Sequence, residues 1–123
     1  MTTTDAVAHY RKESWRLLSQ VDVELERGEI AAASQALWDA AECAIKAAAE
    51  RRGWAHDSFV ALGDVIIRLI DEEGGSIDLN TNFIMASAFD RVVSQQIPLH
   101  EAGIRYCSKG PIKNLIHILE SMD

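Results

Sequence analysis

The sequence feature that most restricts the fold is an alanine-rich segment, residues 30–52, followed by the run Gly-Trp-Ala-His at 53–56. Ten alanines lie between positions 31 and 49, and polar residues recur among them at intervals of three or four: Gln35, Asp39, Glu42, Lys46 and Glu50. This spacing predicts a helix with a narrow polar stripe and an otherwise small, apolar surface. Such a surface needs cover on several sides, and alanines let neighbouring helices approach closely. We therefore expect residues 30–52 to form the central helix of a bundle.

The segment before the alanine-rich helix predicts its partner in a helical hairpin. Apolar residues at core spacing predict a helix that begins near Thr4 or Asp5 and ends before Gly28. Because the connection at Gly28 is short, the two helices should pack antiparallel. An ion pair between Glu42 and Lys46, four positions apart, should support the exposed face of the second helix.

The rest of the chain predicts further helices with short connections. Asp57 or Ser58 should cap a helix that stops within residues 71–75. A capping residue within 78–81 should open a fourth helix, which continues through Ala88, Phe89, Val92 and Val93 until Pro98 kinks or ends it. No element is predicted for residues 99–107, and Gly110-Pro111 should open the final helix. The predicted fold class is an all-α, up-and-down bundle of four to five helices.

Length, cysteine content and hydropathy indicate a single soluble domain. A chain of 123 residues is long enough to bury one core without disulfides or metals, so we expect one domain over residues 1–123. Cys43 and Cys107 form neither a zinc pattern nor a disulfide framework, which is typical of a reducing compartment. The sequence shows no secretory leader and no segment apolar enough to cross a bilayer. We therefore expect a cytoplasmic protein without a membrane partner.

The charge balance argues against general nucleic-acid binding. Nineteen acidic residues against twelve basic ones give a formal net charge of −7, which repels phosphate backbones. Eight of the twelve basic residues form three small groups, at 11–16, 51–52 and 105–113, which are widely separated along the chain. Only folding or dimerisation can bring them together.

Three sequence segments resemble HEPN-type helical domains, specifically their paREP branch. The segments are residues 36–47 (Ala-Leu-Trp-Asp-Ala-Ala-Glu-Cys-Ala-Ile-Lys-Ala), the Gly-Trp-Ala-His run at 53–56 and the Leu-His pair at 99–100, before the final helix. The resemblance covers most of the chain and implies a small helical bundle that dimerises. Some HEPN-type proteins are metal-independent RNases in toxin-antitoxin or defence systems. Others associate with small nucleotidyltransferases, and many have lost their catalytic residues.

The RNase members of that family use an arginine followed four to six residues later by a histidine. Histidine can act as a general acid or base, and arginine can stabilise the charge on a phosphorane. Arg51 and His56 have this spacing, although roughly one such pair is expected by chance in a chain of this composition. They also straddle the end of the second helix, whereas the resemblance places the nuclease pair near the start of a late helix. Three interpretations remain: a catalytic pair, a structural role at the helix end, or a non-catalytic site for an anion or partner.

Other candidate residues each have a structural alternative. The residues that we consider for ligand binding are Arg51, Arg52, His56, His100 and Arg105. The structural interpretation of His100 is a loop or capping residue. His117 and Glu120 share a helix face but do not make a di-iron pattern, so no metal site is predicted. The sequence contains no phosphate-binding loop or dinucleotide motif, and we expect no cofactor. We expect Trp15, Trp38 and Trp54 to be core or dimer-interface anchors rather than stacking platforms.

Three functional hypotheses follow. The first is a non-enzymatic, HEPN-like interaction module that forms a homodimer and associates with a nucleotide, an RNA, a nucleotidyltransferase-like protein or a toxin-antitoxin partner. The second is a metal-independent endoribonuclease that uses Arg51 and His56. The third is a purely structural or antitoxin-like partner protein.

Overall fold

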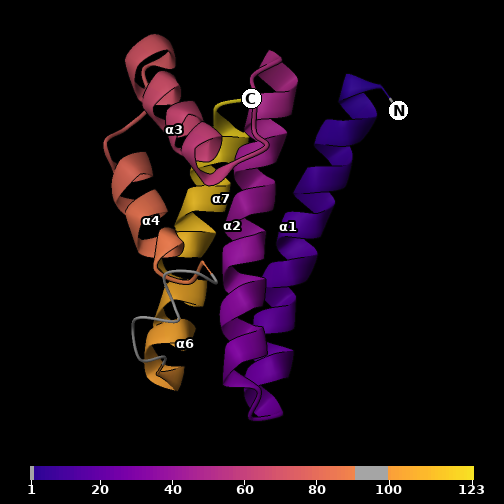
Figure 1. Cartoon of the computed structure of the whole chain (residues 1–123), viewed down its shortest axis with the longest axis vertical. Helices are drawn as coiled ribbons and strands as arrows, with labels where there is room; N and C mark the ends of the chain where they lie inside the picture. Colours follow the sequence, from indigo (N-terminus) through magenta and orange to yellow (C-terminus); the bar gives the residue numbers. More distant parts are fainter. Residues whose placement is uncertain (1, 91–99) are drawn as a thin grey trace.

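The described part of the protein is an all-α bundle of closely packed helices. The structure is a computed structural model that describes residues 2–90 and 100–123. These residues form six helices and no strand: α1 (Thr3–Glu26), α2 (Ile30–Arg52), α3 (Phe59–Glu73), α4 (Asp78–Ser87), α6 (Glu101–Lys109) and α7 (Pro111–Ser121). The connections from α1 to α2, α2 to α3, α3 to α4 and α6 to α7 are short. The helices run up and down the long axis of the molecule except for α3, which is tilted (Figure 1). The predicted all-α bundle is therefore confirmed.

The two longest helices, α1 and α2, form the predicted antiparallel hairpin. Thr2 caps α1 in a capping box with Asp5, so the helix begins slightly before the predicted position. The turn between the helices uses Gly28 at φ +75°, in the left-handed region that glycine adopts without a steric penalty. The two helices lie side by side along most of their length (Figure 1).

The alanine-rich helix α2 is the centre of the bundle, as predicted. It packs against each of the other described helices. Its buried alanines are Ala33, Ala36, Ala40, Ala41, Ala44, Ala47, Ala48 and Ala49. The predicted ion pair on its polar stripe forms, with Lys46 Nζ at 3.0 Å from Glu42 Oε1. The small side chains of α2 therefore allow several helices to surround one axis.

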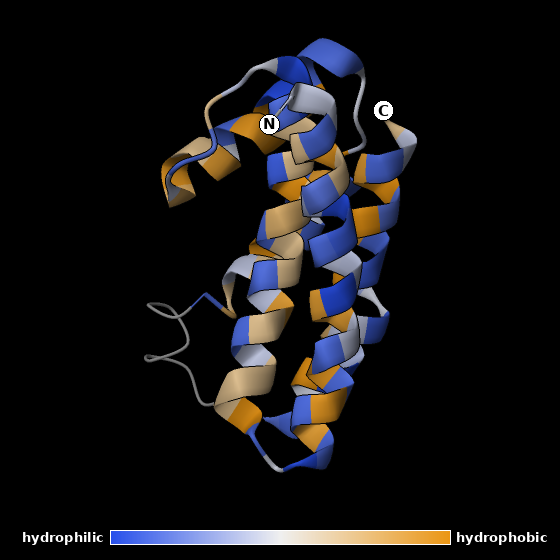
Figure 2. Cartoon of the chain, turned by 90° about the vertical axis from the view of Figure 1, so that its right-hand side faces the viewer, coloured by the Kyte–Doolittle hydropathy of each residue, from blue (hydrophilic) through white to orange (hydrophobic). Residues whose placement is uncertain are grey.

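The core is filled by large aliphatic side chains from the helices around α2. The largest fully buried side chains include Ile66 and Leu69 on α3 and Leu115 on α7. Trp38 on α2 is also buried, and it lies against Phe59 and Phe83 with ring centroids 5.8 Å and 6.3 Å away. Along the long helices, hydrophilic and hydrophobic residues alternate as expected for amphipathic helices (Figure 2).

Helix ends agree with the sequence in some places and not in others. Ser58 caps α3 by accepting a hydrogen bond from the Ala61 amide, and α7 begins at Gly110-Pro111, both as predicted. The predicted capping residue within 78–81 is wrong, because the Ser76 hydroxyl accepts from the Asp78 amide instead.

Helix α4 is shorter than predicted, and α6 occupies a segment for which no element is predicted. Continuation of α4 through Ala88 and Phe89 is wrong, because the chain turns there through hydrogen bonds such as Phe89 N to Ala86 O. The residues Val92, Val93, Pro98 and Leu99, used in the predictions for this region, lie outside the described residues. None of the helices in the described ranges combines the length and apolarity that crossing a bilayer requires.

Candidate functional site

At the C-terminal end of α2, basic groups that are far apart in the sequence meet at one carboxylate. Asp123 Oδ1 lies 2.8 Å from Arg52 Nη1 and 3.9 Å from Arg51 Nε, and its other oxygen accepts from Arg11 Nη2 at 2.5 Å. The Asp123 side chain is only 3% exposed. Folding thus brings two of the three basic groups of the sequence together, but around an acidic side chain of the same chain.

Arg52 has hydrogen-bond partners on three sides. Besides Asp123, its guanidinium donates to Glu73 Oε2 at 2.7 Å and to the Ala48 carbonyl at 2.8 Å, and the side chain is 10% exposed. The hydrogen bond from Arg52 lowers the pKa of Glu73 below its ordinary value. Arg52 therefore joins the ends of α2, α3 and α7, and its donors are not available to a ligand.

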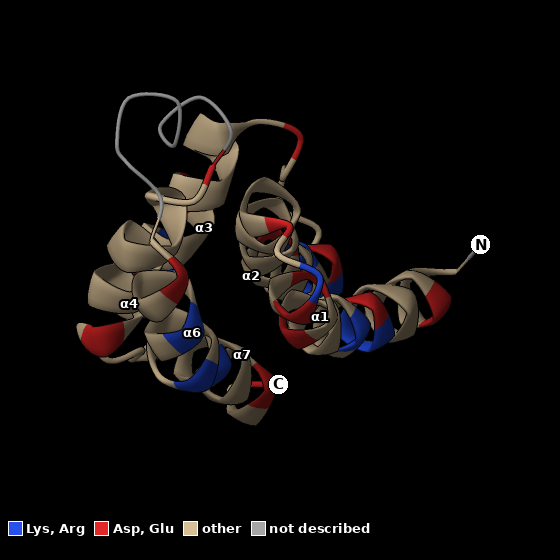
Figure 3. Ribbon diagram, turned by 90° about the horizontal axis from the view of Figure 1, so that it is seen from below, with Lys and Arg blue, Asp and Glu red and all other residues tan. Residues whose placement is uncertain are grey.

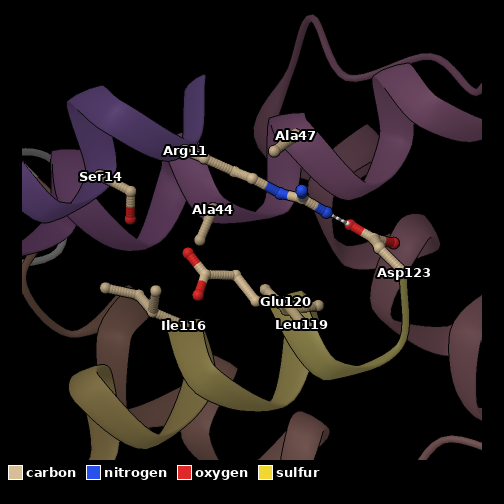
Figure 4. A pocket seen from close by; sticks show the side chains of 8 residues that line it. All are labelled: Arg11, Ser14, Ala44, Ala47, Ile116, Leu119, Glu120 and Asp123. Carbon is tan, nitrogen blue, oxygen red and sulfur yellow. Dashed lines mark hydrogen bonds and ion pairs between the residues drawn. The ribbon is translucent and has the colours of Figure 1, made fainter. Parts of the chain in front are cut away.

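The small cavity beside this cluster is structural. It lies between α1, α2 and α7, and Arg11 spans it to reach Asp123 (Figure 4). Its volume is about 10 Å³, close to the space that one water molecule needs. Arg11 Nε, at its edge, has no hydrogen-bond partner in the described structure, and Glu120 Oε1 accepts from Trp15 Nε1 at 2.6 Å. One bridging water would satisfy Arg11, but an organic ligand does not fit.

His56 lies in the connection between α2 and α3 and has a different set of contacts. Its Nε2 is 2.8 Å from Glu50 Oε2, and its ring lies edge-on to Tyr10 of α1, with centroids 5.7 Å apart. Arg51, in contrast, is 53% exposed and its nearest carboxylate is that of Asp123. The two residues of the predicted catalytic pair therefore contact separate carboxylates. A cation such as Arg51 in the last turn of a helix also complements the helix dipole.

The pocket that contains His56 is acidic. It has a volume of about 170 Å³, an apolar wall formed by Trp38, Phe59 and Leu62, and a polar wall formed by Glu42, Lys46, His56, Asp57, Ser58 and Asp90. Three of these groups are carboxylates, and the ammonium group of Lys46 is already bonded to Glu42.

The carboxyl group of Asp39 is affected by the carboxylates of this pocket. Burial raises the pKa of Asp39 above its ordinary value, and the carboxylates of Glu42 and Asp90 act in the same direction. A phosphate group at His56 would be repelled by this surrounding charge.

The other two candidate ligand-binding residues are at the opposite end of the bundle. His100 is the N-cap residue of α6, where its side chain makes no capping hydrogen bond, and Arg105 Nη2 donates to Glu101 Oε1 at 2.7 Å. Helix α6 lies at the end of the molecule away from the C-terminal end of α2 (Figure 1). The five predicted residues therefore form two groups, Arg51, Arg52 and His56 at one end, and His100 and Arg105 at the other.

The described ranges hold no cluster of metal ligands, and burial raises the pKa of both cysteine thiols. No group of three or more histidine, cysteine, aspartate or glutamate side chains there has the geometry to hold a metal ion. Burial raises the pKa of the Cys43 thiol to about 11, which suppresses its reactive thiolate form at neutral pH. His117 packs against Trp15, with ring centroids 5.0 Å apart.

The partners of the predicted residues were not predictable from the sequence. Asp123 is 112 positions from Arg11 and 71 from Arg52, and Glu73 is 21 positions from Arg52. No local spacing relates these residues. The only sequence signal was the general rule that buried arginines need acidic partners.

Comparison of the chain with protein-family models, with curated proteins and with solved structures gives no match. A function therefore has to be inferred from the side chains themselves.

Proposed function

We propose that this chain is a non-enzymatic association module, resembling HEPN-type domains, that forms a homodimer through the outer faces of α3 and α4. One observation carries this proposal: the position of the exposed apolar side chains. In the part of the chain that the structure describes, seven large hydrophobic side chains are exposed. Five of them, Phe59, Val60, Ile67, Ile77 and Ile84, lie within residues 59–84, and the other two are Val23 and Tyr106.

The spacing of these residues places them in stripes. Val60 and Ile67 are seven positions apart and therefore share one side of α3. Ile77 and Ile84 have the same spacing at the start of α4 and within it. Val60 is 72% exposed and Ile77 is 68% exposed, so most of their apolar surface contacts water.

A second copy of the chain, packed against α3 and α4, would bury these stripes. Burying a valine or isoleucine side chain completely contributes roughly 1.5–3 kcal/mol. In a two-fold symmetric dimer each of the four side chains contributes twice, because the same surface is present on both copies. Exposed apolar surface concentrated on one part of a small protein is typical of an interface.

The arrangement of Arg51 and His56 favours a module without catalytic activity. The two side chains contact separate carboxylates, and the pocket beside His56 is lined by Glu42, Asp57 and Asp90. An RNase would need this region to attract a phosphate, but Lys46, the ammonium group in the lining of this pocket, is paired with Glu42.

The proposal predicts a dimer that surface charges on α3 disrupt. Sedimentation equilibrium of the wild type should give twice the 13.6 kDa chain mass. The double variant Val60→Glu/Ile67→Glu should be monomeric, because dimerisation would remove the two introduced carboxylates from water. Its helical circular dichroism spectrum should be unchanged, because both positions are exposed in the single chain. Val23→Glu, at an exposed apolar residue of α1, should remain dimeric. A monomeric wild type, or a dimer that survives the double substitution, would contradict the proposal.

The enzymatic alternative has its own test. RNA cleavage should be measured for the wild type and for His56→Ala. No cleavage by either protein is expected. Cleavage by the wild type that disappears in His56→Ala would show that the chain is a nuclease and would reject a purely associative function.

A further inference from the structure

An open groove lies at the junction of α4, α6 and α7, and its lining shares no residue with the cluster around Asp123 or with the pocket that contains His56. Its volume is about 500 Å³, within the range of small-molecule sites. The residues that line it are Asn82, Tyr106, Lys109, Gly110, Pro111, Lys113, Asn114 and His117. The five candidate residues from the sequence are not among them.

The groove contains most of the unpaired positive charge of the described chain. In residues 2–90 and 100–123, each arginine and Lys46 has an acidic group within 4 Å, whereas Lys12, Lys109 and Lys113 have none. Two of these three lysines line the groove. Seen from below, the basic segments of α6 and α7 lie next to one another (Figure 3). The chain as a whole has a net charge of −7, whereas these two ammonium groups give the groove a local positive charge.

The first turn of α7 forms part of the wall of this groove and lacks a side-chain cap. Gly110 is the N-cap residue, Pro111 occupies the first helical position, and no side chain accepts from the amides of this turn. Proline has no N–H, so the uncapped donors of this turn are the amides of Ile112 and Lys113. Helix amides of this kind bind anions when positive side chains stand beside them.

Asn82 supplies an independent indication that a ligand belongs there. It lines the groove from α4, it is 7% exposed, and its side-chain nitrogen has no hydrogen-bond partner in the described structure. Buried amide nitrogens in native proteins nearly always have an acceptor. An oxygen atom of a bound ligand would provide one.

We propose that this groove binds the phosphate group of a small phosphomonoester. Lys109, Lys113 and the first turn of α7 bind the phosphate. Asn82 donates to an oxygen of the ligand, and the exposed ring of Tyr106 offers a flat apolar surface to its organic part. A small ligand suits the site better than RNA, because the net charge of the whole chain repels a polyanion.

The test uses phenyl phosphate, with inorganic phosphate and phenol for comparison, in an NMR titration of the full chain at low ionic strength. Phenyl phosphate should cause saturable shifts of the Ile112 and Lys113 amides and of the Asn82 side-chain amide. It should bind more tightly than inorganic phosphate, and phenol should cause no such shifts. Equal affinity for phenyl phosphate and inorganic phosphate would overturn the assignment to a phosphomonoester.

Variants separate a specific site from general charge attraction. Lys109→Gln/Lys113→Gln should weaken binding of phenyl phosphate by about tenfold or more, whereas Lys12→Gln, which removes an unpaired lysine on α1, should change it by less than about twofold. All three lysines are exposed, so the variants should fold like the wild type. The proposal is wrong if Lys12→Gln weakens binding as much as the double variant, or if the α7 amides do not respond.

Discussion

Among the candidate residues, Arg52 is the side chain whose loss should destabilise the protein most. Its guanidinium bonds Asp123, Glu73 and the Ala48 carbonyl while it is 10% exposed. Arg52→Ala leaves the buried Asp123 carboxylate with fewer partners, so the free energy of unfolding should fall by about 2–3 kcal/mol. Urea denaturation measures this change. Arg51→Ala is the matched control and should cost less than about 0.5 kcal/mol, because Arg51 is exposed and 3.9 Å from Asp123.

The same contact makes part of the stability depend on pH. The hydrogen bond from Arg52 lowers the pKa of Glu73 from its ordinary value of 4.5. A carboxylate whose folded pKa is depressed stabilises the fold fully above the unfolded pKa, and this contribution is lost as pH falls through the folded pKa. The wild type should therefore lose more stability than Glu73→Gln when the pH decreases below about 4.5. Identical pH profiles would show that the Arg52–Glu73 pair does not contribute.

Within the helices and their ends, two glycines with similar free space around them should respond to alanine in opposite ways. Gly53 ends α2 at φ +73°, whereas Gly103 lies within α6, outside the left-handed region, and a Cβ added at either position would meet no neighbouring side chain within 4 Å. Gly53→Ala should destabilise the protein by about 1 kcal/mol, because alanine is strained at positive φ. Gly103→Ala should stabilise it by about 0.5–1 kcal/mol through higher helix propensity. Thermal unfolding followed by circular dichroism compares the two, and a shift of the same sign in both would contradict this account.

Helix ends also show which local signals compete. Gly28, Ser58 and Pro111 act as the sequence predicts, because a left-handed glycine, a serine N-cap and an N1 proline each depend on only a few neighbouring atoms. The end of α4 depends on whether the amides there bond carbonyls four residues back, as in an α-helix, or three residues back, as in a tighter turn. There, Ser87 Oγ bonds the Ile84 carbonyl, and the following amides bond three residues back. Apolar spacing alone does not distinguish these patterns.

Across the whole molecule, the small side chains of α2 set how closely the helices pack. Ala40 is fully buried, and the Ser14 hydroxyl of α1 donates to its carbonyl at 2.7 Å. Ala40→Leu should therefore force α1 away from α2 and lower the free energy of unfolding by about 1–3 kcal/mol or more. Ala32→Leu, at an exposed position of the same helix, should change it by less than about 0.5 kcal/mol. Guanidinium denaturation of both variants makes the comparison, and equal effects would mean that close packing at Ala40 is not required.

Three features of the fold follow from the sequence alone: the helical class, the hairpin of α1 and α2, and the central place of α2. Each depends on short-range information, namely the 3.6-residue repeat of apolar positions, the glycine that permits a turn, and the small size of alanine. The resemblance to HEPN-type domains and the functional hypotheses also come from the sequence, and the dimer and RNase assays described above test them.

The surroundings of the candidate side chains, in contrast, are set by tertiary packing. Arg11 and Arg52 meet at Asp123, His56 lies among carboxylates, and Lys109 and Lys113 remain unpaired beside the first turn of α7. These outcomes depend on the angles and offsets at which helices pack, and a charge on one helix contains no information about its distant partner. The periodicity that builds each helix is local, whereas the electrostatic environment of a site is a sum over residues that only folding brings together.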